Sequence, residues 1–417
     1  MSINLLFVNE RPFNPILGGI ERVTDILAKA LIAKGRYSVY YLCGKVEDKD
    51  IHSLDYDFPA KMYTLPEHGL FKVDTNIEYY KELLKRHHID IVINQRGLNG
   101  GFNQILPVGA AKKVSVIHSN PNAQVNHNVA RILLFSNAFK EQLKKLIKIS
   151  VYPFFYFRAI YKAKNMLKKA YYDLAQYSDA IVLLSENDKE EFLSNGVELK
   201  DKILCGIPNP NTFPKDTQYD VNEKEKVILY VGRFDQFQKN VLTLIKIWKR
   251  LFVKFPDWKL VLVGDGPDKE RILEYIEKNK IGNVVMEGAQ KDVARYYRKA
   301  SFVCLTSFYE GWGMTLTEGM SYGCIPCTFN NYGAASDIID DGVNGCLIDA
   351  FKIKEYSIRL AEIMSNDIKR EKMSRAALEK VKDFSVECVV ERWENLFYDL
   401  LVKKENNAFN FCYNTSI

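Results

Sequence analysis

The second half of the chain alternates apolar runs with amphipathic segments, and this alternation limits the folds that the chain can adopt. From Val227 to Ile348, each run long enough for a buried strand is followed by a glycine-containing turn and a segment of helical periodicity. Such alternation favours a parallel sheet with helices on both faces. The predicted strands are Val227–Val231, Trp258–Val263, Val284–Met286 and Ser301–Leu305, and the predicted helices are 240–254, 268–279, 291–299 and one that begins near Met314.

The first half shows the same alternation, beginning with a strand over Ile3–Val8 and a helix over residues 20–34. A strand, a helix and a second strand in this order predict a right-handed crossover and therefore parallel strands. Further strands are expected at Ser38–Cys43, Asp90–Asn94, Lys113–Ile117 and Ala180–Leu184. The predicted fold class is therefore α/β, with two doubly wound domains.

The length of the chain also favours two domains, because 417 residues exceed what one hydrophobic core usually organises. The alternation breaks near Ile207-Pro208-Asn209-Pro210, and the polar stretch 214–226 follows. We place the domains at 1–208 and 209–403. Helices are predicted over 353–365, 367–382 and 385–403, and residues 404–417 form a polar tail.

The apolar run Ile3–Val8 lacks a basic flank and is too short for a signal sequence. Nowhere does an apolar run reach the roughly 18 residues that cross a bilayer. We therefore expect a cytoplasmic protein whose eight cysteines are reduced. The net charge of +6 is mild and suits an anionic substrate or surface. For the C-x-x-C of Cys324 and Cys327, core packing is a simpler explanation than redox or zinc chemistry.

The segment 131–170 has an unusual charge balance, because nine Lys or Arg residues between 139 and 170 accompany the single acid Glu141. We expect two basic helices here, and between them the aromatic cluster Tyr152, Phe154, Phe155, Tyr156 and Phe157. Basic helices with aromatic residues bind the interface of an anionic membrane, where each cation contributes about 1 kcal/mol. An ordinary solvated helix pair and nucleic-acid binding are the competing interpretations. We prefer peripheral contact with an anionic membrane, at its inner face, and expect no nucleic-acid partner.

The stretch from residue 301 to 349 holds the strongest candidate site. A predicted strand ends in a loop that contains Glu310, Gly311 and Gly313, and a helix from Met314 carries Glu318. Glycines let the backbone approach a ligand, and the helix N-terminus offers N–H groups to phosphate. Each carboxylate can accept paired hydrogen bonds from vicinal hydroxyls, such as those of a sugar or a ribose. For one such pair alone, a solvated loop and helix face is the simpler explanation.

Two cations follow the first strand of the second domain. Arg233 and Lys239 lie in the turn between this strand and its helix. The planar guanidinium and the compact ammonium together suit a diphosphate, and charge-assisted hydrogen bonds contribute about 1.5 to 3 kcal/mol each. Gly264 and Gly288 follow the next two strands at the same edge of the predicted sheet.

The first domain offers weaker candidates. Gly18 and Gly19 precede a helix, where successive backbone N–H groups can bind an anion. His118 follows a strand at the edge where ligands of α/β sheets collect, although a lone histidine is often a structural hydrogen-bonding residue. Two D-x-D triplets lie in a polar loop, where we expect no metal site, at Asp48/Asp50 and Asp55/Asp57.

Several stretches together resemble the retaining glycosyltransferases of family 4, which have the GT-B fold. They are GGIERV near the start, a strand that ends in His118, IPNP between the domains, VGRF followed by QKN, LVLVGDGP, and YEGWGMTLTEGMSYG followed by DDGVNGCLI. The resemblance covers nearly the whole chain and is densest over 227–349. It implies two Rossmann-like domains that face each other across a cleft, with the closing helix returning to the N-terminal domain.

The resemblance also assigns roles to residues. Arg233 and Lys239 resemble the pair that neutralises the diphosphate, and Glu318 resembles the carboxylate on the ribose. Glu310 resembles the group that holds the donor sugar, and His118 the residue beside its anomeric carbon and 6-hydroxyl. The implied catalytic residues are His118, Glu310, Arg233 and Lys239. The implied donor-binding residues are Gly18, Gly19, Arg233, Lys239, Gly264, Gly288, Glu310, Gly311, Trp312, Gly313, Met314, Thr315 and Glu318.

The sequence departs from the family pattern in two places: Arg233 and Lys239 are one residue further apart than is usual, and Trp312 stands where Phe or Leu is common. The resemblance implies metal-independent transfer of a hexose from a UDP- or GDP-sugar to a saccharide or lipid-linked acceptor in cell-surface glycan synthesis, with no cofactor. Two alternatives stay open at this point. One is a nucleotide-sugar epimerase of the same fold, and the other is an assembly component that binds a sugar nucleotide without transferring the sugar.

Overall fold

The computed structural model describes residues 2–47, 52, 54–98, 101–105, 107–123, 152–213 and 223–401. Five predictions fall wholly or partly outside these ranges: the basic segment before residue 152, the triplet Asp48/Asp50, the polar stretch 214–226, the end of the helix 385–403 and the tail 404–417. The chain divides into two compact units. Unit 1 consists of the described residues within 1–118, 166–212 and 385–401, and unit 2 of those within 119–165 and 213–384.

Unit 1 is built on a parallel sheet whose strands, within the described residues, follow the order β3-β2-β1-β4-β5-β6-β7. The central strands are buried along most of their length, because helices cover a doubly wound sheet on both faces. Its strands are β1 (Ile3–Asn9), β2 (Tyr37–Cys43), β3 (Lys61–Thr64), β4 (Ile91–Asn94), β5 (Lys112–Ile117), β6 (Ala180–Leu183) and β7 (Ile203–Gly206). Its helices include α1 (Gly19–Ala33), α2 (Asp74–Arg86), α5 (Asp188–Leu193) and α13 (Val386–Leu401).

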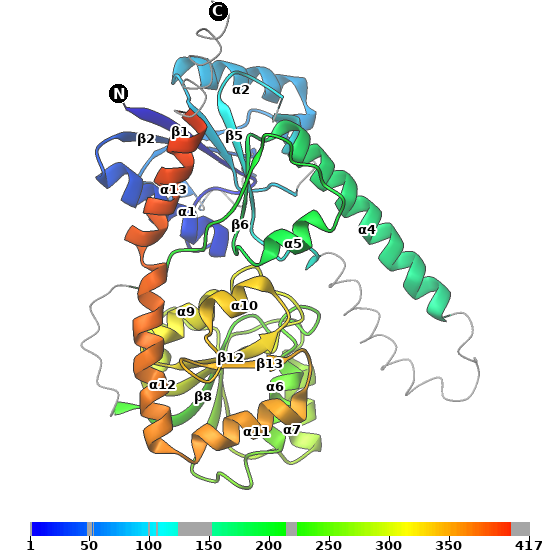
Figure 1. Ribbon diagram of the computed structural model, residues 1–417, viewed down its shortest axis with the longest axis vertical. Helices are drawn as coiled ribbons and strands as arrows, with labels where there is room; N and C mark the ends of the chain where they lie inside the picture. Colours follow the sequence, from blue (N-terminus) through cyan, green and yellow to red (C-terminus); the bar gives the residue numbers. More distant parts are fainter. Residues whose placement is uncertain are drawn as a thin grey trace, which may run out of the picture. The chain divides into compact units, whose positions relative to one another are not determined.

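The helix α13 comes from the end of the chain and packs into the core of unit 1. Val389, Trp393 and Phe397 belong to the same buried cluster as Leu5 of β1 and Leu27 of α1. At the edge of this contact, the Arg36 guanidinium donates to the Glu394 carboxylate at 2.5 Å. Figure 1 shows α13 beside α1, although more than 350 residues separate them in sequence.

Unit 2 is built on a second parallel sheet, whose strands within the described residues follow the order β10-β9-β8-β11-β12-β13. Its core includes Leu229, Trp258 and Phe302, each 1% exposed or less. The strands are β8 (Glu225–Val231), β9 (Lys259–Val263), β10 (Val284–Gly288), β11 (Ala300–Cys304), β12 (Ile325–Asn330) and β13 (Cys346–Asp349). The helices are α6 (Val241–Lys249), α7 (Lys269–Lys278), α8 (Ala294–Lys299), α9 (Met314–Met320), α10 (Gly333–Ile338), α11 (Ile353–Met364) and α12 (Asp367–Lys380).

The helix α4 (Tyr152–Tyr177) corrects one expectation. The aromatic cluster from Tyr152 to Phe157, predicted between two helices, forms the first turns of this single helix. Pro153 does not prevent this, because the first turn of a helix has no partner for its backbone N–H groups. Further along, Ala163, Leu167 and Tyr171 recur every four residues on the buried face of α4.

Candidate active site

The predicted site residues of unit 2 lie where the strand order of its sheet reverses. β8 and β11 are neighbours, and the sheet continues from β8 to β9 on one side and from β11 to β12 on the other. Open α/β sheets bind ligands at the carboxyl ends of the strands at such a switch point. The loop 232–240 follows β8 and the loop 305–313 follows β11, so both groups of predicted residues come to this point.

The side chains of Lys239 and Glu310 form an ion pair at this switch point. Lys239 Nζ donates to Glu310 Oε1 at 2.7 Å, and Ser307 Oγ donates to the same oxygen at 2.6 Å. The side chain of Glu310 is 7% exposed and that of Lys239 is 23% exposed. The structure thus brings two of the predicted residues into contact. It adds Ser307, which no sequence pattern indicated.

Arg233 is the more exposed of the two cations. Its Nη2 donates to Asp235 Oδ2 at 2.6 Å. The other oxygen of Asp235 accepts from the backbone N–H groups of Phe237 and Gln238, at 2.9 and 3.2 Å. Asp235 therefore shapes the loop and also holds the guanidinium. Asp235 was not predicted from the sequence. Its position in a turn, two residues after Arg233, is the sequence signal that could have indicated it.

Hydrogen bonds to the backbone join the two loops. The N–H of Phe308 donates to the carbonyl of Gln238 at 2.8 Å. Asn331, which follows β12, donates from Nδ2 to the carbonyls of Ser307 and Phe308, at 3.1 and 2.9 Å. Because these hydrogen bonds hold both loops to each other and to the sheet, Lys239 and Glu310 are positioned before any ligand binds.

Two predicted glycines lie at the carboxyl ends of β9 and β10: Gly264 follows β9, and Gly288 is the last residue of β10. Gly264 has φ of 147°, and a Cβ atom on it would lie 1.9 Å from the carbonyl oxygen of Gly232. No side chain fits there, because two backbone turns meet. The N–H of Gly264 donates to the carbonyl of Gly288 at 2.8 Å, and Gly288 has open space around its Cα. The turns after three neighbouring strands are thus connected at the carboxyl edge.

Glu318 lies in the second turn of α9 and is 2% exposed. Tyr297 of α8 donates its hydroxyl to Glu318 Oε2 at 3.0 Å. The ring of Tyr297 is buried and stacks on Tyr322, with ring centroids 6.1 Å apart and planes 8° from parallel. Tyr297 therefore orients this carboxylate. Sequence reasoning did not find Tyr297, because its contact with Glu318 spans 21 residues and two helices.

The other predicted residues of the loop differ in their surroundings. Gly313 has φ of 86° and precedes the first residue of α9. The Trp312 side chain is 3% exposed and packs edge-on against Phe384, with ring centroids 5.0 Å apart. Its indole thus belongs to the core of unit 2, and its role in donor binding stays a prediction. Three further residues of the predicted set are partly exposed: Gly311, Met314 and Thr315.

Tyr309 is a further residue of this loop that the sequence analysis did not single out. Burial, together with the negative charges of Asp235 and Glu310, raises the pKa of Tyr309 to about 12. Its hydroxyl therefore stays protonated at physiological pH and can donate a hydrogen bond.

A separate cluster of polar residues lies at the switch point of unit 1, between β1 and β4. Arg96 Nε donates to Asn9 Oδ1 at 3.0 Å, and Asn9 Nδ2 donates to Glu21 Oε1 at 3.0 Å. Arg96 Nη2 lies 4.0 Å from the same oxygen of Glu21. None of these three residues was predicted as a site residue. The strands after which Asn9 and Arg96 lie were predicted.

His118 follows β5, and its Nε2 atom bonds to Gln95 Oε1. Because an amide oxygen only accepts, the ring carries its proton on Nε2, and Nδ1 is an acceptor. Burial, and the nearby charge of Arg96, lower the pKa of His118 to about 3. The imidazole is therefore neutral at physiological pH and suits a hydroxyl better than a phosphate.

The two glycines of the first loop lie at the start of α1. Gly18 is the residue before the helix, and Gly19 is its first residue. A Cβ atom on Gly18 would lie 2.7 Å from Glu21 Oε2, which is the end of a side chain and not backbone. The space beside Gly18 is therefore filled by a group that can move.

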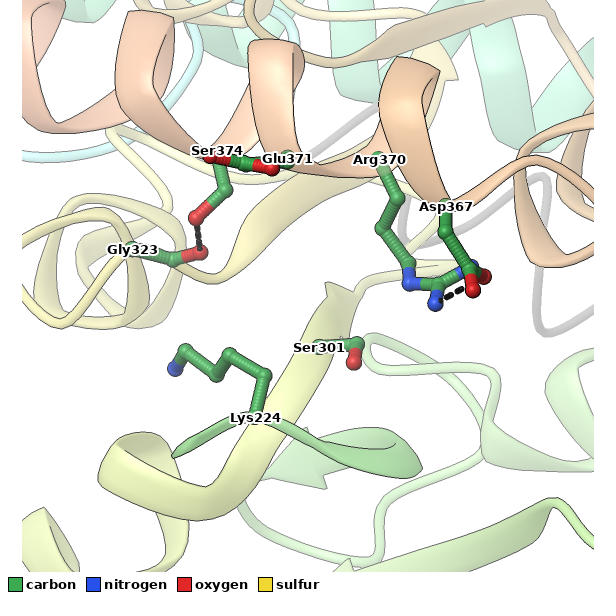
Figure 2. Close-up of a pocket in the computed structure, with 7 residues that line it drawn as sticks. All are labelled: Lys224, Ser301, Gly323, Asp367, Arg370, Glu371 and Ser374. Atoms are coloured by element: carbon green, nitrogen blue, oxygen red, sulfur yellow. Dashed lines mark hydrogen bonds and ion pairs between the residues drawn. The ribbon is translucent and has the colours of Figure 1, made fainter. Parts of the chain in front are cut away.

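A hollow of about 220 Å³ lies near the amino ends of the strands of the unit 2 sheet. Figure 2 shows the residues that line it. It is lined by Lys224, Ser301, Gly323, Asp367, Arg370, Glu371 and Ser374. Ser374 Oγ donates to the carbonyl of Gly323 at 2.5 Å, and Arg370 donates to Asp367 at the same distance. Lys224 precedes β8, so the hollow is near the amino ends of the strands and apart from the switch point.

In the part of the chain that the structure describes, no three His, Cys, Asp or Glu side chains are grouped so that they could hold a metal ion. Among the described helices, none is long and apolar enough to cross a membrane.

Comparison with known proteins gives a match over the second half of the chain. Residues 213–380 match the family model described as "Glycosyl transferases group 1". The amylovoran biosynthesis glycosyltransferase AmsD of Erwinia amylovora is 28% identical over 242 residues, which are 56% of this chain and 65% of AmsD.

A relative from Campylobacter jejuni is 28% identical over 229 residues, covering 54% of this chain and 61% of the relative. Its name describes an α-1,4-N-acetyl-D-galactosaminyltransferase that acts on a PP-undecaprenol-linked saccharide. The chain thus spans less than two thirds of the length of these two relatives.

The structure of Anabaena Alr3699/HepE in complex with UDP and glucose has a TM-score of 0.68 with this chain at 15% identity. The likeness covers 95% of this chain and 99% of the Anabaena chain. Such likenesses show the fold, which is the GT-B fold of two Rossmann-like domains, as predicted.

Proposed function

We propose that this chain, whose residues 213–380 match the group 1 glycosyltransferase model, is a retaining glycosyltransferase. It transfers a hexose from a UDP- or GDP-sugar to a saccharide or lipid-linked acceptor in cell-surface glycan synthesis, without a metal. The observation that carries the proposal is the set of charged groups at the unit 2 switch point. There, Arg233 and Lys239 offer two cations, and Glu310 offers a buried carboxylate.

The two cations account for the chemistry that the donor requires. As the bond between the anomeric carbon and the diphosphate oxygen breaks, negative charge grows on the diphosphate and positive charge on the sugar ring. Fixed cations next to the leaving group stabilise this transition state more than the ground state. Arg233 and Lys239 are suited to this task by charge and by their place after β8. Glu318 is suited to the ribose hydroxyls, because Tyr297 fixes its orientation.

Retention follows if the acceptor attacks the face from which the diphosphate leaves. The acceptor oxygen forms the new bond to the anomeric carbon, and its proton passes to the departing phosphate oxygen. No protein nucleophile is then needed. We assign Glu310 to the hydroxyls of the donor sugar, and His118 to its 6-hydroxyl. The neutral ring of His118 supports this assignment, since Nδ1 can accept a hydrogen bond from a hydroxyl.

The proposal is tested with labelled UDP- and GDP-sugars and a lipid extract as the source of acceptors. The parent protein should move label into the lipid fraction. Arg233→Ala and Lys239→Ala should each lower this transfer at least about 100-fold, because each removes a charge that the transition state needs. Lys226→Ala is the matched control, since Lys226 lies in β8, the strand that precedes the loop of Arg233 and Lys239, and is ion-paired with Asp257.

Near-parental transfer by Arg233→Ala or Lys239→Ala would contradict the assignment of the diphosphate site. Conversion of the sugar nucleotide without any acceptor would indicate an epimerase instead. Binding of the nucleotide without turnover would indicate a component that does not catalyse transfer.

A second proposal concerns the acceptor, which we place in an anionic membrane reached through α4. Four aromatic side chains are exposed among those described on this helix, and the three most exposed are Phe157 by 67%, Tyr161 by 69% and Tyr172 by 62%. At 100° per residue these three fall within about 60° of one another around the helix axis. The fourth, Tyr177, is 38% exposed. The basic residues exposed on the same helix are Arg158, Lys162, Lys164, Lys168 and Lys169. Aromatic rings flanked by cations suit the headgroup region of such a membrane, and this would place the protein at its inner face.

Flotation on liposomes measures this contact directly. Changing Lys162, Lys168 and Lys169 together to Glu should abolish binding to vesicles that contain phosphatidylglycerol, because about 1 kcal/mol per cation is lost and repulsion is added. Lys-to-Glu changes at Lys369, Lys372 and Lys382 near the end of unit 2 are the control with equal charge change; Lys372 and Lys382 are exposed and Lys369 is partly exposed. Equal flotation of the two variants would contradict a role for α4.

A further inference from the structure

The two charged groups that we assign to different parts of the donor are bound to each other in this structure. Lys239, assigned to the diphosphate, donates to Glu310, assigned to the sugar, at 2.7 Å. Ser307 also donates to the same carboxylate oxygen. The charge of Lys239 is therefore balanced by a carboxylate that is itself almost fully buried.

The frame around this ion pair holds it in place. The backbone N–H of Lys239 donates to the carbonyl of Asp235 at 2.7 Å, which fixes where the lysine side chain begins. The carbonyls of Ser307 and Phe308 accept from Asn331, which fixes the loop that carries Glu310. Both side chains therefore start from fixed positions.

We infer that Glu310 is a specificity-determining residue that makes the site select a nucleotide carrying a sugar over the bare nucleoside diphosphate. The inference rests on the proposed function. A bare diphosphate has to take Lys239 away from Glu310, and this leaves a buried carboxylate with fewer donors, which is costly. A donor with its sugar supplies new hydroxyl donors to Glu310 as it takes Lys239. The sugar-bearing donor thus gives new partners to both Lys239 and Glu310. The bare nucleotide product, in contrast, has to compete with the Glu310 carboxylate for Lys239.

Calorimetric titration of the parent and of Glu310→Gln with UDP, GDP, UDP-glucose and GDP-mannose tests this. The glutamine keeps the shape of the side chain and an oxygen acceptor, but it removes the charge that competes for Lys239. The comparison uses UDP or GDP, whichever the parent protein binds more tightly. Glu310→Gln should bind this bare nucleotide about tenfold more tightly than the parent does, which corresponds to one charge-assisted contact. The sugar nucleotide should gain less or lose affinity, so the preference for the sugar-bearing form should fall at least about tenfold.

A tighter complex with the product is a result that a merely structural role would not give, since a damaged site binds every ligand more weakly. Glu394→Gln is the matched control, because it removes a mostly buried carboxylate, 12% exposed, from an ion pair with Arg36 in unit 1. Glu394→Gln should leave the affinity for the bare nucleotides and the affinity for the sugar nucleotides unchanged.

An unchanged or weaker affinity of Glu310→Gln for both UDP and GDP overturns the inference. Failure of the proposed function gives a different result: Lys239→Ala would then bind UDP and GDP as the parent does.

Discussion

The two units of this molecule share a strand order but carry different chemistry at the point where that order reverses. In unit 2, this point holds Lys239 and Glu310 in an ion pair, with Arg233 on the same loop as Lys239. In unit 1, it holds the Asn9–Arg96–Glu21 cluster, and next to it is an imidazole that stays neutral. Equivalent places in one kind of fold therefore carry different groups, and we propose different ligands for them: the diphosphate in unit 2 and a sugar hydroxyl at His118 in unit 1.

The units also differ in how their glycine turns are packed, and this difference gives the largest expected effect. Gly264→Ala places a methyl group against the carbonyl of Gly232 and forces an unfavourable φ, so unit 2 should lose about 3 kcal/mol or more. Gly18→Ala meets only the end of the Glu21 side chain and should cost about 1 kcal/mol or less. Urea unfolding measures both changes. Equal losses would show that the turns do not differ in this way.

The polar cluster of unit 1 gives the next largest effect. Arg96→Ala leaves the buried Glu21 carboxylate with one fewer donor group nearby, so the free energy of unfolding should fall by about 1 to 2 kcal/mol. Arg86→Ala, at the exposed end of α2, is the control. Because Arg96 belongs to unit 1, the affinity for UDP and GDP should stay at the parental value. A loss of nucleotide affinity would break the division of roles between the units.

A smaller effect is expected at the ribose site of unit 2. Tyr297→Phe removes the hydroxyl that orients Glu318, which corresponds to about 1 kcal/mol. The KM for the donor should rise about fivefold while kcat stays near the parental value. Tyr275→Phe on α7 serves as the control. An equal fall in kcat would mean that Tyr297 supports more than ground-state binding.

The smallest effect concerns pH. The pKa of His118 is lower in the folded protein than in the unfolded chain, so the unfolded chain binds the extra proton first as pH falls. Stability should therefore decline as pH falls below about 6.5, by less than about 1 kcal/mol from this group at pH 6. His118→Asn should flatten this part of the pH profile in thermal unfolding. An unchanged profile would show that the imidazole keeps its ordinary pKa.

The sequence allowed much of the fold to be predicted, because the physical signals involved are local. Apolar runs such as Val227–Val231 and Ser301–Leu305 mark buried strands, and the glycines that follow them mark the turns after these strands. The aromatic cluster after Tyr152 was placed wrongly, because a proline near the start of a helix has the same signature as a proline between two helices.

The site could be predicted only in part. Arg233, Lys239 and Glu310 were indicated by residue type and by their position after a strand. Their grouping depends on β8 and β11 being neighbours, and strand order is a long-range property. Supporting residues such as Ser307 and Tyr297 carry no signal of their own, since a serine or a buried tyrosine is common in any core.

The packing of α13 into unit 1 has a consequence for the order of synthesis. The residues of unit 1 up to Thr212 leave the ribosome long before Trp393 and Phe397, which complete its buried cluster. At about 5 to 20 residues per second, this unit waits roughly 10 to 40 seconds with an apolar face uncovered. The helix α13, which is translated late, thus completes the core of unit 1, which is translated first. A nascent chain that stalls after unit 1 has emerged and before α13 has emerged is the form of this protein most in need of a chaperone.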